Sequence, residues 1–329
     1  MPQSSQRKLW NYTPALPLKI APFWDWPLKP IQSIVHLLRS WKPLKERAIF
    51  LLVAVAIWLW FTPEMERMAT LHWSWVFEIW LRNLVIITAT AGGLHLYLYV
   101  LRKQGDELRY DKRPLIKKAK VFTFGSQTKD NVFWSLASGL TVWTTWETAM
   151  MWCLANGYIS MITFQESPIW FIILLLLIPI WAGLHFFVQH RILHIGPLFR
   201  WFHSWHHKNQ NTGPWSGLAM HPVEHLILFS DNLLYFLVAC HPIHIYFNFM
   251  LHGMGAPTSH VGYHGIKLTE NKSFMLGDFY HQLHHRFFDC NYGDGDTPWD
   301  KWFGTFHDGT AEADERMRER RRQIWQNKA

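Results

Sequence analysis

Histidine is the residue type whose number and spacing point to chemistry in this chain. The sequence has 329 residues and 20 histidines, and 16 of these lie between His185 and His285. Four clusters have members three or four positions apart: His190 and His194; His203, His206 and His207; His260 and His264; His281, His284 and His285. In a helix, such spacings place side chains on one face, one turn apart. The clusters therefore predict groups of converging imidazoles.

Converging imidazoles predict bound metal, because a neutral imidazole nitrogen is a good donor to iron, zinc, copper and nickel. Buried histidines also need partners for both ring nitrogens, and so many could hardly satisfy one another without an ion. Ten ligands exceed one coordination sphere, so we expect two ions with about five ligands each. An all-histidine site binds zinc as readily as iron, and zinc is possible in the protein as purified. Oxidation of unactivated C–H bonds in a membrane setting would favour two iron ions.

Long apolar segments precede and interrupt these clusters. Four of them, with at most one charge each, could cross a membrane: 48–63, 83–101, 132–162 and 167–190. The first is short for a span, which needs about 20 residues. A further apolar stretch, 232–265, is broken by Pro242 and Pro257 and fits a hairpin better than one helix. We expect an all-α integral membrane protein with about four transmembrane helices and a Pro-broken hairpin over 226–256.

The distribution of positive charge predicts how the helices are oriented. Segment 102–130 has nine Lys and Arg, segment 64–78 has only Arg67, and segment 156–167 has none. Cytoplasmic loops carry the excess of Lys and Arg. The N-terminus, the 102–130 loop and the C-terminal part should then be cytosolic, and the fourth span should deliver His190 to that face of the membrane. The membrane would be the endoplasmic reticulum in a eukaryote and the inner membrane in a bacterium.

These features divide the chain into four parts. We expect a basic cytosolic leader over 1–47, with a short surface helix at 31–41. Transmembrane helices and the basic loop follow over 48–185, then a histidine-rich catalytic region over 186–307, and a charged helical tail over 308–329. The net charge of +8 fits an anionic membrane surface rather than nucleic acid, given how the basic runs flank apolar ones. The three cysteines are widely spaced and support neither a disulfide framework nor a cysteine zinc site.

The order of the histidine motifs resembles the fatty acid hydroxylase superfamily, also called the sterol desaturase family. The resemblance covers about 180–310 and rests on H-x3-H, H-x2-H-H and H-x2-H-H, here His190–His194, His203–His207 and His281–His285. Four further stretches agree with it: His221–Glu224, His260–Tyr263, Phe288–Gly293 and Trp299–Thr305. The chain departs from the pattern at Lys301, where arginine is usual, and in the more polar stretch Gly293–Asp296.

The resemblance implies a fold, a ligand set and an activity. It implies about four spans topped by a cytosolic cap with two metals, and oxidation of a lipid with O2 and electrons from a cytochrome b5 or a ferredoxin and its reductase. It implies no catalytic side chain beyond the ligands, which are His190, His194, His203, His206, His207, His260, His264, His281, His284 and His285. Sterol members often have Asp at the place of His264. The expected function is hydroxylation or desaturation of a sterol, fatty-acyl or sphingoid lipid, and the stretches at 221–224 and 288–293 favour the sterol type.

Two other classes of function remain as alternatives. A membrane zinc hydrolase would need an open coordination position and a nearby carboxylate base, and the H-E-x-x-H motif is absent. A metal transporter would place its site at mid-membrane within the spans, whereas the clusters follow the spans. A His-rich metal-binding scaffold belongs to the same non-enzymatic class as the transporter.

Several other polar residues need an assignment. His221 and His225 could be extra ligands, but we favour a supporting role in which His221 and Glu224 brace a helix start or a ligand imidazole. His185 and Glu147 lie in apolar stretches, where polar groups are often functional, although Glu147 could equally lie at the membrane edge. We expect most of His95, His241, His244 and His252 to be packed or interfacial. Asp289, Asp294 or Asp296 could orient an imidazole or relay protons. Asp300 should have a structural role.

Overall fold

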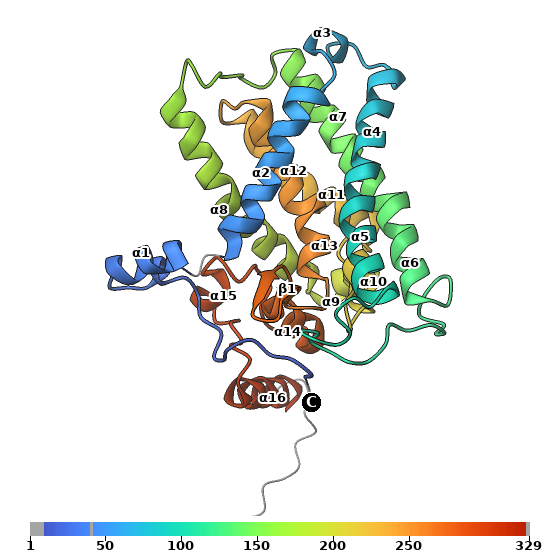
Figure 1. Ribbon diagram of the computed structural model, residues 1–329, viewed down its shortest axis with the longest axis vertical. Coiled ribbons are helices and arrows are strands. Elements are labelled where there is room, and N and C mark those ends of the chain that lie inside the picture. Colours follow the sequence, from blue (N-terminus) through green and yellow to red (C-terminus); the bar gives the residue numbers. More distant parts are fainter. Residues whose placement is uncertain (1–9, 40–41, 327–329) are drawn as a thin grey trace, which may run out of the picture.

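The structure is a computed structural model, and it describes residues 10–39 and 42–326. Long helices run roughly along the long axis of the molecule (Figure 1). They are α2 (Lys42–Trp60), α4 (Trp73–Ile87), α7 (Thr141–Ala155), α8 (Pro168–Leu193) and α12 (Pro242–Gly253). Helix α12 packs against α2, α7 and α8 and is almost wholly buried, so it forms the centre of the bundle.

Two of these helices are extended by π-helical turns. Helix α4 continues through η2 (Thr88–Gly92), α5 (Gly93–His95) and η3 (Leu96–Val100), so the helical run covers 73–100. Helix α7 is preceded without a break by α6 (Gln127–Trp134) and η4 (Ser135–Leu140). The predicted second span begins at 83, after the charged Arg82. The helical run begins ten residues earlier, at Trp73, and includes both Glu78 and Arg82. The third ends at Ala155 and not near 162.

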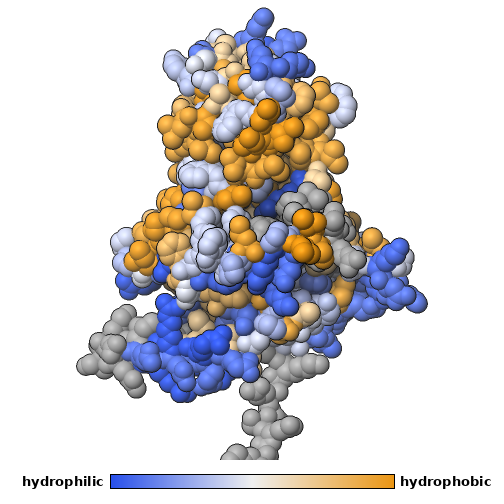
Figure 2. Space-filling view, turned by 90° about the vertical axis from the view of Figure 1, so that its left-hand side faces the viewer, coloured by the Kyte–Doolittle hydropathy of each residue, from blue (hydrophilic) through white to orange (hydrophobic). Residues whose placement is uncertain are grey.

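Two helical runs, Trp73–Val100 and Pro168–Leu193, are long and apolar enough to cross a membrane. Only 22% and 39% of their most apolar stretches are buried within the protein. Helices that expose so much apolar surface differ from the core helices of soluble proteins, and lipid is the natural cover for it. Figure 2, which views the molecule from the side of α8, shows an apolar belt above a mostly polar lower part. The count of four spans stays a prediction.

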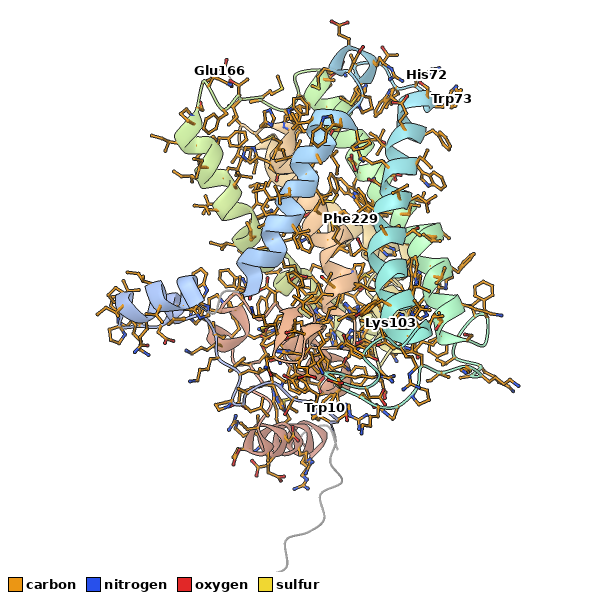
Figure 3. The ribbon with its side chains drawn as sticks, in the orientation of Figure 1. Trp10, His72, Trp73, Lys103, Glu166 and Phe229 are labelled. Atoms are coloured by element: carbon orange, nitrogen blue, oxygen red, sulfur yellow. The ribbon has the colours of Figure 1, made fainter. Side chains whose placement is uncertain are left out.

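The two ends of the bundle differ in character. Helix α3 (Met65–Met68) and the 156–167 loop lie at one end, together with His72 and Glu166 (Figures 1 and 3). The opposite end holds Trp10, Lys103 and the helices α14 (Phe279–Phe287), α15 (Trp299–Trp302) and α16 (Ala311–Gln326). The three segments that are rich in Lys and Arg thus share one end, as a single orientation in the membrane requires. Which compartment this end faces stays a prediction.

The apolar region after residue 221 is a broken hairpin, close to the predicted one. It consists of α11 (Pro222–Leu228), the 3₁₀ helix η7 (Phe229–Phe236), α12 and α13 (Gly255–Ser259). The chain reverses at 237–241, and Pro242 begins α12 at a position where the missing amide hydrogen has no cost. The first turns after the reversal bury His244, which hydrogen-bonds to the carbonyl of Phe171 at 2.9 Å.

The expectation of an all-α fold is wrong in one place. Strands β1 (Gly265–Thr269) and β2 (Lys272–Met275) pair as an antiparallel hairpin with a register shift between Lys267 and Thr269. The two residues between them, Glu270 and Asn271, form the turn, for which asparagine is well suited. The hairpin follows His264 directly and is too short to show clear alternation in the sequence.

Residues 10–26 of the predicted leader form a strap across the cap. In the strap, Asn11 N–H donates to the carbonyl of Tyr110 at 2.8 Å, and Leu18 N–H to that of Asp308 at 2.8 Å. After the short η1 (Pro22–Trp24), the indole of Trp24 donates to the carbonyl of Asp296 at 3.0 Å. Helix α1 (Pro30–Arg39) then falls where the surface helix at 31–41 was predicted; residues 40–41 lie outside the described part.

Glu147 is part of a buried ion pair inside the bundle and does not lie at the membrane edge. Its side chain is fully buried and pairs with Arg82, while Asn83 donates to its other oxygen at 2.9 Å. These contacts tie α4 to α7. A paired and hydrogen-bonded charge is the form in which an ionisable side chain is tolerated in an apolar bundle.

Candidate metal centre

Four helical segments bring the predicted ligands together. His190 lies in the last turn of α8, and His194 is the residue that caps the end of this helix. After α9 (Gly196–Leu198), the π-helical turn η5 (Phe199–His203) and α10 (Ser204–His207) carry the second motif. Helix α14 carries the third motif, and His260 caps the C-terminus of α13.

Nine of the ten predicted ligands form two groups of side chains. The five-histidine cluster consists of His190, His194, His203, His207 and His284, and the four-histidine cluster of His206, His260, His281 and His285. Within each cluster the nitrogens that face one another all lie within 4.8 Å. All these residues are buried except His194, which is half-buried. This arrangement fits two ions with five and four imidazole donors.

The two H-x-x-H-H motifs divide their histidines between the clusters in opposite ways. From the first motif, His203 and His207 enter the five-histidine cluster and His206 enters the other. From the second, His281 and His285 enter the four-histidine cluster and His284 crosses over. The members four positions apart share a helix face, and the remaining one faces the neighbouring cluster.

Hydrogen bonds to Nδ1 fix the orientation of several rings. The Nδ1 atoms of His190 and His284 donate to the carbonyls of Tyr292 and Cys290, both at 2.6 Å. The Nδ1 of His203 donates to Glu224 Oε1 at 2.7 Å. Because these oxygens only accept, the proton of each neutral ring lies on Nδ1, and Nε2 presents a lone pair to the centre of the cluster.

The facing lone pairs show that the clusters suit a cation. The Nε2 atoms of His190 and His203 are 2.9 Å apart, and those of His207 and His284 are 3.0 Å apart. Two unprotonated nitrogens at this distance repel each other unless a positive ion lies between them. In the four-histidine cluster, His260 Nε2 lies 3.0 Å from the Nε2 atoms of both His281 and His285.

The spacing also favours more than four ligand positions around each ion. With bonds of about 2.1 Å to the ion, neighbouring nitrogens lie about 3.0 Å apart in an octahedron and about 3.4 Å apart in a tetrahedron. The observed contacts between Nε2 atoms are 2.9–3.1 Å. A closed tetrahedral zinc site fits these distances less well.

Burial keeps the rings neutral and ready to bind. Burial, reinforced by neighbouring imidazoles, holds the pKa of His206, His207, His281, His284 and His285 well below the ordinary value. Burial alone lowers the pKa of His260 to about 4. A metal ion competes for each nitrogen with a proton, so neutral rings at pH 7 favour metal binding.

His264 is the predicted ligand that the structure places elsewhere. It lies after the turn that follows His260, outside both clusters. Its Nδ1 lies 3.3 Å from the hydroxyl of Tyr110, and its ring packs against Tyr12. The chain is no longer helical after residue 260, so the spacing of four does not place the two rings on one face.

The supporting role favoured for His221 and Glu224 agrees with the observed contacts. His221 caps the start of α11 by accepting from Val223 N–H, and Glu224 accepts from the ligand candidate His203. His225 points the other way, toward Ser138 Oγ at 2.9 Å and the carbonyl of Leu218 at 3.1 Å. Asp300 accepts hydrogen bonds from Tyr280, Thr305 and the amides of Tyr292 and Gly293, which is the structural role expected of it.

A second polar group lies deeper in the bundle, and only one of its members, His185, was indicated by the sequence. His185 contacts Ser230 Oγ at 3.0 Å, and His252 Nε2 lies 2.7 Å from Asp231 Oδ2. His252 was expected at an interface, but it is buried because α12 is the central helix. The sequence did not single out Asp231, because the segment that forms η7 is otherwise largely apolar.

A single cavity of about 380 Å³ opens onto both clusters. Ligand candidates from each cluster line it, including His190, His203, His206, His260 and His281. Phe186, Met220, Leu228 and Leu251 form part of an apolar wall, and the strap contributes Pro14, Leu18 and Ile20. The volume is in the range of sites for small organic ligands.

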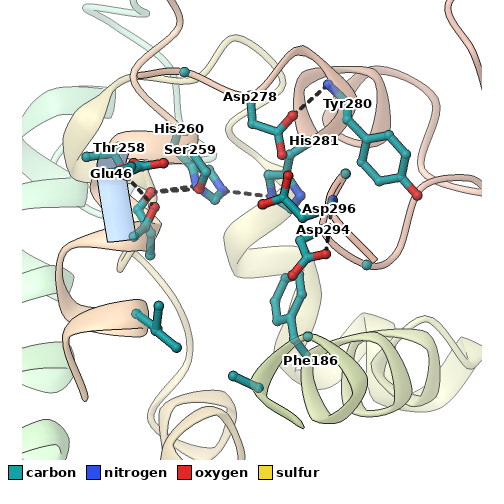
Figure 4. Close-up of a pocket in the computed structure, with 18 of the residues that line it drawn as sticks. Glu46, Phe186, Thr258, Ser259, His260, Asp278, Tyr280, His281, Asp294 and Asp296 are labelled. Atoms are coloured by element: carbon teal, nitrogen blue, oxygen red, sulfur yellow. Dashed lines mark hydrogen bonds between the residues drawn. The ribbon is translucent and has the colours of Figure 1, made fainter. Parts of the chain in front are cut away.

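The cavity has a charged mouth. Figure 4 shows the carboxylates of Asp278, Asp294 and Asp296 near His281, with Glu46 beside Ser259 and His260. Arg47 at the start of the bundle pairs with Asp296 at 3.1 Å and approaches Asp294 at 4.0 Å. The aspartates at 294 and 296 therefore join α2 to the C-terminal loop.

Comparison with known proteins identifies the central region. Residues 171–305 match the family described as fatty acid hydroxylase. This region contains all nine clustered histidines. No solved structure matches the chain.

Curated relatives are similar over the same part of the chain. A delta(7)-sterol-C5(6)-desaturase of Nicotiana tabacum is 31% identical over 39% of this chain and 48% of its own length. The cholesterol 25-hydroxylase of Homo sapiens is 30% identical over 40% and 50%, and the methylsterol monooxygenase 1 of Gallus gallus is 27% identical over 43% and 49%. The chain thus spans about half the length of the curated relatives it matches.

Proposed function

We propose that this chain, whose residues 171–305 belong to the fatty acid hydroxylase family, is a membrane oxidoreductase that oxidises a C–H bond of a lipid with two iron ions and O2. The observation that carries the proposal is the pair of buried histidine clusters that share one largely apolar cavity. Two all-nitrogen sites facing a largely apolar cavity suit oxidation, because imidazole is a good ligand for redox-active iron.

When bound, two reduced iron ions would supply the electrons and the open positions that O2 activation requires. The chain itself does three things in this proposal. The nine histidines hold the ions, and the apolar wall with Phe186 and Leu228 positions an unreactive part of the lipid. The strap excludes water from the side of the cap. We assign no further side chain to the reaction, which yields either an alcohol or an alkene after the first hydrogen is removed.

The lipid class and the partners are also proposals. The printed names of the relatives are a sterol desaturase, a cholesterol hydroxylase and a methylsterol monooxygenase, which supports a sterol before a fatty-acyl or sphingoid lipid. Electrons would come from a separate cytochrome b5 or ferredoxin system. The protein would cross the membrane several times, with the site on the cytosolic face, where the basic segments lie.

The proposal is tested with the full chain purified in detergent, loaded with Fe(II) and supplied with a reductase system, O2 and a mixed pool of sterols and fatty-acyl lipids. Mass spectrometry should find an oxygenated or unsaturated lipid that requires O2 and is absent with His206→Ala and His284→Ala. His264→Ala leaves both clusters intact but also changes the lining of the cavity, so it is the matched control for metal content. A metal-loaded protein that forms no O2-dependent product with any donor would refute the proposal.

A further inference from the structure

The second polar group of the bundle borders the same cavity as the metal clusters. His252 lies near the end of α12, eight residues before His260, and its ring lines the cavity. At 1.5 Å per residue along a helix, its distance from the clusters is about 12 Å at most along the axis. Its neighbour Phe229, whose ring meets that of His252 edge-on at 5.8 Å, lies at mid-height in the bundle (Figure 3). The cavity therefore has one polar side chain within its apolar inner part.

Asp231 holds this histidine in a defined state. Asp231 is fully buried; its Oδ2 accepts from His252 Nε2 at 2.7 Å, and its Oδ1 accepts from Asn232 at 3.0 Å. An accepting carboxylate keeps the proton of a neutral imidazole on Nε2. The other nitrogen, Nδ1, is then a hydrogen-bond acceptor. The backbone beside this ring is closely packed, because a Cβ on the next residue, Gly253, would meet the ring of Trp143 at 2.7 Å.

Asp231 occupies the Nε2 of His252, so Nδ1 is the ring nitrogen that this cavity-lining residue can offer to a ligand. Among the described residues, no group hydrogen-bonds to it, and it is not one of the unpartnered atoms that are fully enclosed, such as His206 Nδ1 and His185 Nδ1. An acceptor that borders an apolar cavity is costly to leave unsatisfied when a lipid displaces water from it. A lipid that carries a hydroxyl group at this position satisfies it.

We propose that His252, oriented by Asp231, recognises a hydroxyl group of the lipid and so sets which lipid and which carbon reach the metal clusters. This inference rests on the proposed function for the meaning of the cavity, and it adds the substrate class: a lipid alcohol whose O–H donates to His252 Nδ1. The reacting carbon then lies roughly 12 Å or less from the hydroxyl, as the helix rise between His252 and His260 allows. His252 is a specificity-determining residue and takes no part in the oxidation itself.

Two isosteric substitutions separate recognition from a purely structural role. The amide nitrogen of Gln takes the place of Nε2, so His252→Gln keeps the hydrogen bond to Asp231 and removes the acceptor at Nδ1. The amide of Asn lies near Nδ1, so His252→Asn does the reverse. The measurement is equilibrium binding of a 3-hydroxysterol and its 3-deoxy analogue, and of a long-chain alcohol and its alkane, to the full chain in detergent.

Wild-type protein should bind one alcohol roughly 10- to 100-fold more tightly than its deoxy partner, as loss of one hydrogen bond to a buried acceptor predicts. His252→Gln should fold and melt like wild type but lose this preference. The pair that shows the preference identifies a sterol or a long-chain alcohol as the source of the hydroxyl.

Equal binding of alcohol and deoxy lipid by wild type would overturn the inference. So would a preference that survives in His252→Gln, since His252 would then only join η7 to α12. Binding does not depend on turnover, so a clear preference with no O2-dependent product would contradict the proposed function and leave the hydroxyl site standing.

Discussion

Each H-x-x-H-H motif contributes histidines to both clusters, so single substitutions in these motifs test directly which histidine binds which ion. His206→Ala should remove a ligand of the four-histidine cluster and His284→Ala a ligand of the five-histidine cluster. Each change should lower the metal content from about two ions to about one per chain, because an incomplete site binds its ion weakly. Metal analysis of the purified protein measures this.

His264→Ala is the control for this prediction. His264 continues the H-x3-H spacing from His260 but contacts Tyr110 and Tyr12 instead of the clusters. The His264→Ala variant should keep both ions. A loss of one ion in His264→Ala, equal to that in His206→Ala, would show that the loop after His260 folds differently around the metals.

Glu224 should matter for metal affinity although it is not a ligand. Glu224→Gln keeps an oxygen near His203 Nδ1 but removes the negative charge that strengthens this imidazole as a donor. Loss of such support typically weakens metal binding about 10- to 100-fold. Competition with a chelator measures the change. His221→Ala removes the cap of α11 and the ring contacts with Phe202 and Trp205. It should cost about 1 kcal/mol of stability or more with unchanged affinity; equal affinity in both variants would contradict this role of Glu224.

The lowered pKa values predict how the metal-free protein responds to acid. Burial lowers the pKa of His260 to about 4, so between pH 7 and 5 the unfolded chain binds a proton there and the folded chain does not. Stability rises with pH where the unfolded state binds more protons, so it must fall on acidification. This one group contributes on the order of 2 kcal/mol, and the other buried histidines act in the same direction. Melting of chelator-treated protein at pH 7 and 5 tests it, and equal midpoints would contradict it.

At this scale, spacing predicted which histidines converge but not how they are divided. A spacing of three or four positions needs a continuing helix to bring side chains together, and this holds in α8, α10 and α14 but not after His260. Assignment of His206 to one ion and His203 to the other depends on tertiary packing. The carbonyls of Tyr292 and Cys290 that fix two rings belong to the backbone and leave no trace in residue type.

At the scale of elements, the Arg82–Glu147 pair joins α4 to α7 inside the bundle. Arg82→Met should leave Glu147 buried without its partner, which destabilises a fold by about 3–5 kcal/mol. The double variant Arg82→Met/Glu147→Leu should regain most of that loss, because two apolar side chains replace a buried pair well. Thermal unfolding in detergent compares the two. A double variant less stable than the single one would show that the charges have a function of their own.

Element boundaries were predicted less well than element types. The apolar pattern located the helices, but charged residues were assumed to end them, and Arg82 is in fact accommodated inside a helix by Glu147. Strands β1 and β2 are too short to show alternation, and the strap over 10–26 has no periodic pattern at all. Its role follows from hydrogen bonds to residues about 100 and 290 positions away, such as Tyr110 and Asp308, which local sequence does not encode.

At the scale of the whole molecule, an apolar bundle and a polar cap meet at the metal clusters. Helix α8 delivers His190 from the bundle, and the later motifs deliver the other ligands from the cap. The cavity extends from the strap and the charged mouth, past the clusters, to His252 in the bundle. A lipid in this cavity would have its reacting carbon beside the clusters and away from water, which is the condition for controlled oxidation.

The central claim is that two iron ions in these clusters oxidise a lipid with O2. The most direct measurement is a titration of chelator-treated protein with Fe(II), and in parallel with Zn(II), in which the O2-dependent lipid product is measured at each ratio of metal to chain. We expect product only with iron, and the amount of product should rise until about two ions are bound per chain. A product that forms equally with zinc, one that is complete at a single ion, or none at any ratio of iron would contradict it.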